Sequence, residues 1–422
     1  MNRWLRVDRR LGVTAAGGFG AAAVACGLKP SAQPDLALVV GDPGTVAAGV
    51  FTTNRVVAAP VVWSRDRLAA SADARVVVLN SGNANACTGP AGEAAVLATV
   101  QRAAAELGCR PEQVLVCSTG VIGVPLDVGR LTDGLAKAAV SLDRSAGQAA
   151  AEAIRTTDKV AKQAGVQLAG GITVAGMAKG AAMLAPALAP PPGRPAARRH
   201  ATMLAVLTTD AVAEPAALRA ALAAASETTF NRITVDGCQS TNDTVLLLAS
   251  GASGTRPHPD DLADAVEAVC HDLAGQMLAD AEGATKVVRV QVGGAGSVTA
   301  ALTVARRIAD SPLVKTAVYG GDPNWGRVLQ AAGTAGVDFD PEAIRLEVAG
   351  GPGAADVQRV QEPPERVALV RNGAPTGADA GGAMACAEIE FRLHLGGRGP
   401  WAEVRTADLT TEYVRLNSEY TT

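Results

Sequence analysis

Short apolar runs alternate along the chain with longer alanine-rich stretches in which apolar residues recur at helical spacing. The runs with strand character cover residues 36–40, 56–63, 75–80, 114–117, 287–292 and 367–370. The windows with helical character cover residues 92–107, 128–142, 214–228 and 259–279. In the last window, the apolar positions 262, 266, 269, 273 and 277 lie on roughly one face. This pattern predicts an α/β protein built from layered sheets and helices.

One segment interrupts the alternation. Residues 187–200 contain four prolines and three arginines. A cluster of prolines cannot pack as a helix or a central strand, so we expect an exposed loop. By composition alone, the simplest interpretation of this loop is an interdomain linker.

Composition narrows the classes of partner. The chain has 422 residues, 48% of them apolar, with 46 glycines and 3% aromatics, which indicates a globular core of small aliphatic side chains. A net charge of −3 gives no extended field of one sign, so neither nucleic acid nor an anionic membrane is an expected partner. The balance favours a small-molecule substrate.

Cysteine and histidine usage bears on compartment and metal binding. The seven cysteines are scattered, without CxxC pairs or histidines at metal-ligand spacing. Reduced thiols of this kind are typical of a cytoplasmic protein. With only four histidines in the chain, we predict no metal site.

The residues after the proline-rich segment carry a candidate nucleophile. Ala201 and Thr202 open an apolar run that continues to residue 207. A threonine in such a run is commonly a β-branched strand residue. The alternative is that its hydroxyl attacks the carbonyl of Ala201 and Thr202 becomes a free N-terminus. Its α-amine, with an ordinary pKa of about 8, could then accept the hydroxyl proton.

Two glycine-rich polar stretches follow predicted strands. They are Asn80-Ser81-Gly82-Asn83-Ala84-Asn85-Ala86-Cys87-Thr88-Gly89 and Cys117-Ser118-Thr119-Gly120-Val121-Ile122-Gly123. Each is compatible with an ordinary strand-to-helix turn. A Thr-Gly pair can also direct a hydroxyl and an amide hydrogen at a developing oxyanion. The residues alone leave both interpretations open.

These stretches, taken together and in order, resemble the ornithine acetyltransferase family, whose relatives include N-terminal-nucleophile aminopeptidases. The resemblance runs nearly end to end. It also includes Gly49-Val50-Phe51-Thr52-Thr53-Asn54, Thr156-Thr157-Asp158, Met177-Ala178-Lys179-Gly180, Ala201-Thr202-Met203-Leu204, Ser240-Thr241-Asn242-Asp243-Thr244, Glu282-Gly283-Ala284-Thr285-Lys286 and Gly321-Asp322-Pro323-Asn324-Trp325-Gly326-Arg327.

The resemblance implies an ornithine acetyltransferase/DmpA-like fold and cleavage between Ala201 and Thr202. The products would be an α chain of residues 1–201 and a β chain of residues 202–422, assembled as two α and two β chains in the cytoplasm. Thr202 would take the acetyl group from N-acetylornithine and pass it to glutamate in a ping-pong reaction of arginine biosynthesis. No cofactor is implied, and the residues do not decide whether acetyl-CoA is an additional acetyl donor.

The resemblance also assigns roles to individual residues. Thr119 and Gly120 match the oxyanion pair that assists the nucleophile Thr202. The matched substrate contacts are Thr157, Lys179, Thr202, Glu282, Asn417 and Thr422. A cation and an anion suit the carboxylate and ammonium groups of an amino acid. Asn242 and Asp243 are placed either at the site or in a turn. The Asp322–Arg327 loop is interpreted as structural, and Cys87 and Cys117 as thiols that are not nucleophiles.

The chain departs from the family pattern beside the scissile bond. Fourteen residues, 187–200, separate Pro186 from Ala201, where relatives have only a few. A long approach could relax the strain that self-cleavage needs. Two alternatives therefore stand beside the transferase: a hydrolase (aminopeptidase or amidase) of the same superfamily, and an unprocessed, inactive homologue.

Overall fold

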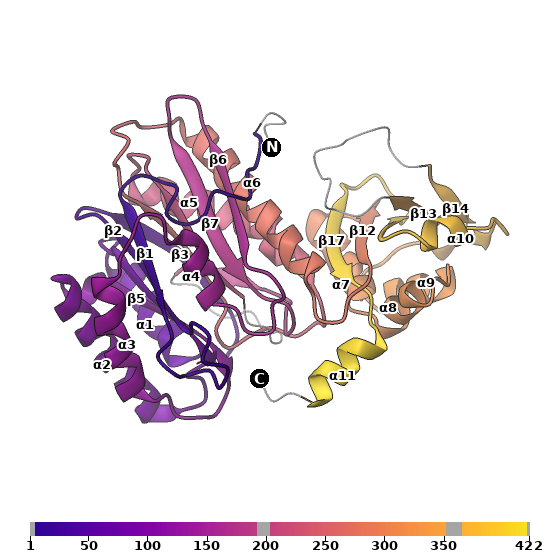
Figure 1. The fold of residues 1–422 in the computed structure, drawn as a ribbon. Helices are drawn as coiled ribbons and strands as arrows, with labels where there is room; N and C mark the ends of the chain where they lie inside the picture. Colours follow the sequence, from indigo (N-terminus) through magenta and orange to yellow (C-terminus); the bar gives the residue numbers. More distant parts are fainter. Residues whose placement is uncertain (1–4, 192–202, 352–364, 420–422) are drawn as a thin grey trace. The chain divides into compact units, whose positions relative to one another are not determined.

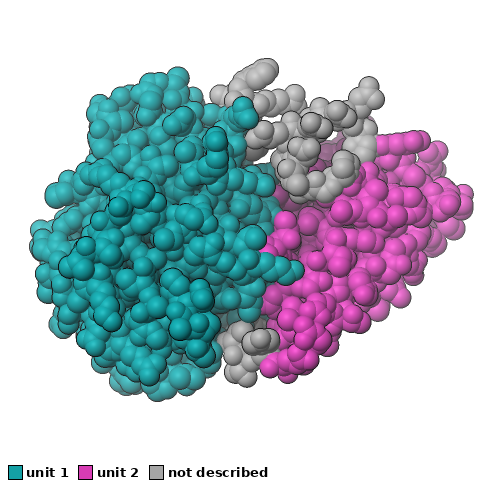
Figure 2. Space-filling model, in the orientation of Figure 1, with its two compact units in different colours: residues 1–231, 238–277, 421–422 teal, residues 232–237, 278–420 magenta. Residues whose placement is uncertain are grey.

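The computed structural model describes residues 5–191, 203–351 and 365–419, drawn as a ribbon in Figure 1. The chain forms two compact units, coloured separately in Figure 2. In the described part, the first unit holds residues 5–191, 203–231 and 238–277, and the second holds residues 232–237, 278–351 and 365–419. Sheets and helices occur in both units, which confirms the predicted mixed α/β class.

The first unit contains a four-stranded sheet with a helical layer on one face. Its strands, in spatial order, are β1 (Phe19–Val24), β2 (Leu36–Gly41), β4 (Val76–Asn83) and β5 (Val114–Val121). Only β4 and β5 run parallel. The helices α2 (Gly89–Leu107) and α3 (Val128–Val140) share one buried cluster with Val76 and Val78 of β4.

A six-stranded sheet covers the opposite face. Its order is β6 (Lys162–Gln167), β7 (Thr173–Lys179), β9 (Leu204–Thr209), β11 (Thr244–Ala249), β3 (Val46–Thr52) and β8 (Leu188–Ala189). Val77 and Leu79 of β4 join a cluster with Met177 and Leu204 of this second sheet. Successive side chains of a strand point to opposite faces, so β4 is apolar on both sides because both sides are covered.

The first unit contains further helices. They are α1 (Ala59–Ala70), α4 (Gly147–Ala153), α5 (Pro215–Thr228) and α6 (Pro259–Ala279), with short 3-10 turns at Pro111–Gln113 and Phe230–Arg232. The bounds of α6 coincide with the predicted helical window. Its apolar stripe is buried, as Leu262, Val266, Val269, Leu273 and Met277 are each at most 2% exposed.

The second unit is a seven-stranded sheet with helices. The strand order is β10 (Ile233–Thr234), β17 (Ala402–Ala407), β12 (Val287–Gly293), β16 (Glu388–His394), β13 (Arg345–Gly351), β14 (Val367–Arg371) and β15 (Ala374–Pro375). The helices are α7 (Val298–Ala309), α8 (Pro312–Tyr319), α9 (Trp325–Gly333), α10 (Gly381–Met384) and α11 (Thr411–Glu419), with a 3-10 turn at Pro341–Ala343. Val288, Val290 and Val292 of β12 pack with α7, while Arg289 between them is exposed. This alternation is typical of a sheet covered on one face.

Two expectations about local structure were wrong. The run 56–63, predicted as a strand, contains the start of α1 at Ala59. A proline in the first helical turn favours that start, and the buried positions Val61, Ser64 and Leu68 have helical spacing. The segment 187–200 was expected to be an exposed loop throughout. Its residues Leu188–Ala189 instead form β8, paired with Phe51 and Thr52, while residues 192–200 lie outside the described part.

Candidate active site

Thr119 and Gly120 lie at the end of β5, beside the parallel strand β4. Thr119 pairs with Ser81 and Gly120 with Gly82. The strand runs through Val121, so these residues belong to the strand and not to a turn after it, as the sequence had suggested. Gly120 has a φ of +129°, and a Cβ atom there would overlap the backbone of Gly82. Glycine is therefore required where β5 lies against Gly82 of β4.

The ammonium group of Lys179 joins Thr119 to a second loop. Lys179 ends β7 and is 3% exposed. Its Nζ donates hydrogen bonds to the hydroxyls of Thr119 (3.2 Å) and Thr156 (2.8 Å). Because the Thr119 oxygen accepts this bond, its own proton can be donated to an oxygen of a ligand. The structure thus brings the predicted residues Thr119 and Lys179 into contact.

The turn at residues 156–158 is held by a buried carboxylate. Asp158 Oδ1 accepts bonds from Lys162 Nζ and from the backbone N–H of Gly180, both at 2.7 Å, and Oδ2 accepts from the N–H of Thr156 at 3.2 Å. Burial raises the pKa of Asp158, but Lys179, Lys162 and the Gly180 N–H lower it by more, so it lies well below its usual range. The predicted residue Thr157 is half-buried between Thr156 and Asp158.

Asn242 connects the two glycine-rich stretches. Its Nδ2 donates to the carbonyls of Ala84 (2.7 Å) and Ser118 (2.9 Å). A second link joins the stretches directly, because the Ser118 hydroxyl donates to Asn80 Oδ1 at 2.6 Å. Of the two roles considered for Asn242, these bonds favour the structural one: it fixes the strand that carries Thr119.

The start of β9 lies beside Lys179. Leu204, its first residue, pairs with Lys179 on one side and with Thr244 on the other. The N–H of Met203 donates to Asp243 Oδ1 at 2.7 Å, and Asp243 is fully buried. Ala201 and Thr202 lie outside the described residues. Met203, the covalent neighbour of Thr202, is therefore anchored next to the strand that ends in Lys179.

Glu282 and Asn417 contact each other in the second unit. Asn417 on α11 donates from Nδ2 to Glu282 Oε2 at 2.8 Å. The loop carrying Glu282 is fixed by Thr410, whose hydroxyl donates to the carbonyl of Gly283 at 2.8 Å and accepts from the N–H of Tyr413 at 3.0 Å. Two predicted substrate contacts thus lie together. Thr422, another predicted substrate contact, lies outside the described residues.

The other residues singled out in the sequence, Asn324, Arg327 and Cys117, have positions that fit a role in stabilising the fold. Asn324 caps α9 by accepting from the N–H of Arg327, and Arg327 donates to the carbonyl of Leu313 at 2.9 Å. Cys117 is buried, and burial raises the pKa of its thiol to about 12. At neutral pH it is a protonated thiol and a poor nucleophile.

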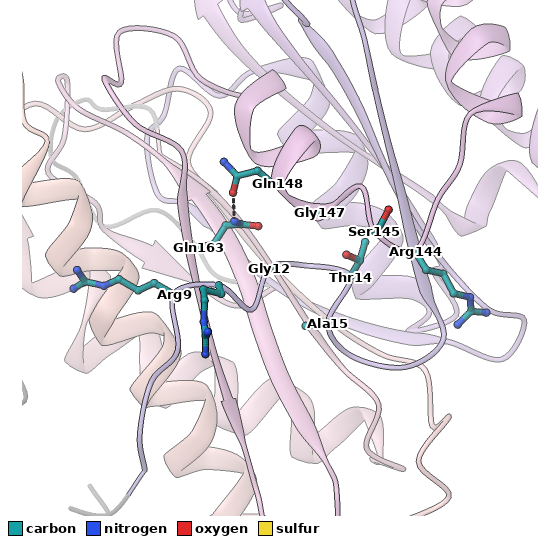
Figure 3. Close-up of a pocket in the computed structure, with 10 residues that line it drawn as sticks. Arg9, Gly12, Thr14, Ala15, Arg144, Ser145, Gly147, Gln148 and Gln163 are labelled. Carbon is teal, nitrogen blue, oxygen red and sulfur yellow. Dashed lines mark hydrogen bonds between the residues drawn. The ribbon is translucent and has the colours of Figure 1, made fainter.

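The first unit also contains a cavity of about 450 Å³ near the N-terminal segment. Gly12, Thr14, Ser145 and Gln163 are among the residues that line it (Figure 3). Arg9 points away from this group in the view, and its guanidinium pairs with Asp272 at 3.0 Å. None of the predicted site residues that the structure describes lines the cavity, so we do not assign it to the active site.

The described residues contain neither a cluster of metal ligands nor a helix that could span a membrane. In the described ranges, no three His, Cys, Asp or Glu side chains are grouped as metal ligands require. No helix there combines the length and apolar character needed to cross a membrane.

Three residues that belong to the hydrogen-bonded group around Lys179 were not assigned a role from the sequence. They are Thr156, Asp158 and Lys162. Thr156 and Asp158 belong to a motif that the sequence analysis quoted, but only Thr157 was carried over to the site. The signal that could have indicated them is the spacing of four residues between Asp158 and Lys162, a carboxylate and an ammonium that can pair. That both are fully buried is visible only in the tertiary structure.

Comparison with known proteins gives matches over nearly the whole chain. The ArgJ family model matches residues 20–422. The arginine biosynthesis bifunctional protein ArgJ of Thermobifida fusca is 45% identical over 413 residues, covering 98% of this chain and 100% of that protein. The ArgJ protein of Mycobacterium tuberculosis is 47% identical over 423 residues, covering 98% of each.

Among solved structures, one chain of the ornithine acetyltransferase of Mycobacterium tuberculosis, crystallised with ornithine, matches with 48% identity and a TM-score of 0.43. The match covers 44% of this chain and 100% of that one.

Proposed function

The chain belongs to the ArgJ family, and we propose that it is a glutamate N-acetyltransferase (ornithine acetyltransferase) of arginine biosynthesis. It moves the acetyl group of N-acetylornithine to glutamate, with Thr202 as the acetyl carrier. The observation that carries this proposal is the contact of Lys179 with Thr119, next to the register pair Lys179–Leu204. An ammonium for the substrate carboxylate and a hydroxyl for the oxyanion therefore lie close to the strand that continues from Thr202.

Self-cleavage comes first in the proposed sequence of steps. The Thr202 hydroxyl attacks the carbonyl of Ala201, the C–N bond breaks, and water hydrolyses the resulting ester. This releases an N-terminal Thr202 whose α-amine, with an ordinary pKa of about 8, acts as the base. The anchoring of Met203 by Asp243 supports this step, because it fixes the backbone immediately after the bond to be broken.

Acetyl transfer then proceeds in two half-reactions. The Thr202 hydroxyl attacks the acetyl carbonyl of N-acetylornithine and loses its proton to the α-amine. The Thr119 hydroxyl and the Gly120 N–H stabilise the tetrahedral oxyanion, each such donor contributing about 3 kcal/mol. The C–N bond breaks, ornithine leaves with the proton, and the acetyl group remains as an ester on Thr202. The amine of glutamate attacks that ester and regenerates the hydroxyl.

Several parts of the proposal rest on the family resemblance alone. These are the substrate contacts of Thr157, Glu282, Asn417 and Thr422, the assembly of two α and two β chains, and the cytoplasmic location. We also propose that no cofactor takes part, because the acetyl group is carried by Thr202 itself. Both ArgJ relatives described above are named bifunctional, which supports testing acetyl-CoA as a second donor.

The first experiment is intact mass spectrometry of the purified protein under denaturing conditions. Two species, one beginning at Thr202, are expected. A single full-length species would favour the unprocessed homologue. Thr202→Ala should remain one chain and should transfer no acetyl group; separation of this variant into two chains would mean that the nucleophile is misassigned.

The acceptor is tested by following ornithine release from N-acetylornithine with and without glutamate. We expect release beyond the first turnover to require glutamate, and N-acetylglutamate to appear in equal amount. Continued release without glutamate would instead identify the hydrolase, with water as the acceptor.

A further inference from the structure

Helix α11, labelled in Figure 1, carries the predicted substrate contact Asn417 but buries no side chain. Of its nine residues, Thr411–Glu419, Tyr413 and Leu416 are half-buried and the others are exposed. A helix of this length is marginal in water unless an apolar face packs against another element. The position of α11 in the second unit therefore depends largely on polar contacts.

Hydrogen bonds attach α11 to two segments of the second unit. Thr410, immediately before the helix, and Asn417 bond the loop that carries Glu282, as described above. The Tyr413 hydroxyl donates to Asp236 Oδ2 at 3.2 Å, and a bond to a carboxylate is stronger than one between neutral groups. Residues 413 and 417 are four apart, so they lie on one face of the helix, one turn from each other. The bond to Asp236 thus fixes the face from which Asn417 projects.

The acceptor of this bond belongs to an anchored segment. The strand β10, just before it, pairs with β17. Thr234 donates its hydroxyl to Asp310 Oδ1 at 2.6 Å. Lys315, which is 3% exposed, donates from Nζ to the carbonyl of Val235 at 2.6 Å. Asp236 therefore follows directly on a backbone that hydrogen bonds hold in place, and α11 is tied to a fixed point.

Glu282 and Asn417 together suit an ammonium group. A carboxylate and an amide oxygen both accept hydrogen bonds from an ammonium, and the carboxylate also supplies the opposite charge. Glu282 is 8% exposed, and charge attraction is stronger in such a place than in water. In N-acetylornithine the α-nitrogen is an amide, so the side-chain amine is the only ammonium of that substrate.

We infer that Tyr413 is a positioning residue for substrate specificity: by bonding Asp236, it holds Asn417 against Glu282, where the two bind the side-chain ammonium of the substrate. The inference rests on the proposed function for the identity of the substrate and for the roles of Asn417 and Glu282. The apparent affinity of a ligand falls in proportion to the fraction of molecules in the binding-competent state. Without the Tyr413 hydroxyl, that fraction is smaller. Because α11 buries no side chain, its release leaves the core of the second unit intact.

The test compares two substrates, N-acetylornithine and N-acetylnorvaline, which has the same carbon chain without the side-chain amine. We expect Tyr413→Phe to lower kcat/KM about fivefold for N-acetylornithine, mostly through KM, and less than about twofold for N-acetylnorvaline. General damage to the fold would lower both values alike. Tyr319→Phe, at the exposed end of α8, is the matched control and should retain both values.

Hydrogen exchange followed by mass spectrometry reports on the helix itself. The amides of α11 should exchange faster in Tyr413→Phe than in the wild type, while those of β12 should not change. Three outcomes would overturn the inference: equal exchange of α11 in the two proteins, an unchanged KM for N-acetylornithine, or an equal loss of kcat/KM for both substrates.

Calorimetry separates this inference from the proposed function. Titration of the full-length protein with ornithine and with norvaline makes the same comparison without catalysis. A wild type that prefers ornithine but transfers no acetyl group contradicts the function alone, and the inference is then tested by the loss of that preference in Tyr413→Phe. A wild type that binds the two ligands equally contradicts the inference, whether or not it transfers an acetyl group.

Discussion

The hydroxyl of Thr119 has two hydrogen-bonding roles at one atom. Its oxygen accepts a bond from the ammonium of Lys179, which is almost fully buried. A nearby positive charge makes the O–H group a better donor, because it stabilises negative charge on the oxygen side. Under the proposed reaction, this donor acts on the oxyanion, while Lys179 acts on the substrate carboxylate. The contact therefore couples the binding of substrate to the stabilisation of the tetrahedral intermediate.

Replacing Thr119 by valine keeps the shape of the side chain and removes the hydroxyl. We expect kcat for acetyl transfer to fall by about 10²-fold or more, since one oxyanion donor is lost, with a smaller change in KM. Steady-state kinetics with N-acetylornithine and glutamate measure both constants. Thr303→Val, at an exposed position of α7, controls for the loss of a threonine hydroxyl. A Thr119→Val enzyme with the kcat of the wild type would exclude this hydroxyl from the oxyanion site.

Among the elements, the strand end of β5 depends on a loop far away in the sequence. Asn242 donates to carbonyls on both glycine-rich stretches, at Ala84 and Ser118. Asp243, the next residue, bonds the N–H of Met203. One short segment before β11 therefore fixes both the strand that carries Thr119 and the beginning of β9. This arrangement explains how the backbone next to the proposed cleavage site and the strand that carries Thr119 can keep fixed positions relative to each other.

Asn242→Ala removes the buried side-chain amide that donates to the carbonyls of Ala84 and Ser118. We expect the free energy of unfolding to fall by about 1–3 kcal/mol for each carbonyl left without a partner. Urea unfolding followed by circular dichroism measures this change. Gln101→Ala, on the exposed side of α2, should change stability by less than about 0.5 kcal/mol. Equal stability of the two variants would mean that the Asn242 bonds contribute nothing net.

At the scale of the whole molecule, the predicted cleavage does not follow the compact units. It would divide the six-stranded sheet of the first unit. Strands β6, β7, β3 and β8 precede residue 201, while β9 and β11 follow it. In the spatial order β6-β7-β9-β11-β3-β8, the two later strands lie in the middle. Each predicted chain therefore supplies backbone hydrogen bonds that the other requires.

This interleaving predicts that the cleaved protein stays in one piece. The two chains should elute together in native size-exclusion chromatography and separate only in denaturant. Their separation would break the backbone hydrogen bonds between β7 and β9 and between β11 and β3. The elution volume also tests the proposed assembly, since two processed copies have twice the 42.4 kDa of one chain. Separate elution of the chains without denaturant would contradict the sheet order, and elution near 42.4 kDa would contradict the pairing of copies.

Much of the order of elements could be predicted from the sequence, because apolar periodicity is a local property. The helix at Pro259–Ala279 coincides with its predicted window, and five of the six predicted strand runs coincide within a few residues with β2, β4, β5, β12 and β14. The exception, residues 56–63, shows where local propensity fails. Valine and tryptophan favour strands in isolation, but burial of one face against neighbouring elements made this stretch the beginning of a helix.

The sequence by itself determined the family, through motifs spread over the chain, and with it the candidate residues Thr119, Lys179 and Thr202. Only the tertiary structure decided which side chains meet. Thr119 and Lys179 are 60 residues apart and touch because the ends of strands β5 and β7, which belong to two stacked sheets, lie together. The buried pairing of Lys162 with Asp158 was likewise unpredictable, because burial and charge balance depend on packing from distant segments, whereas periodicity depends on neighbours along the chain.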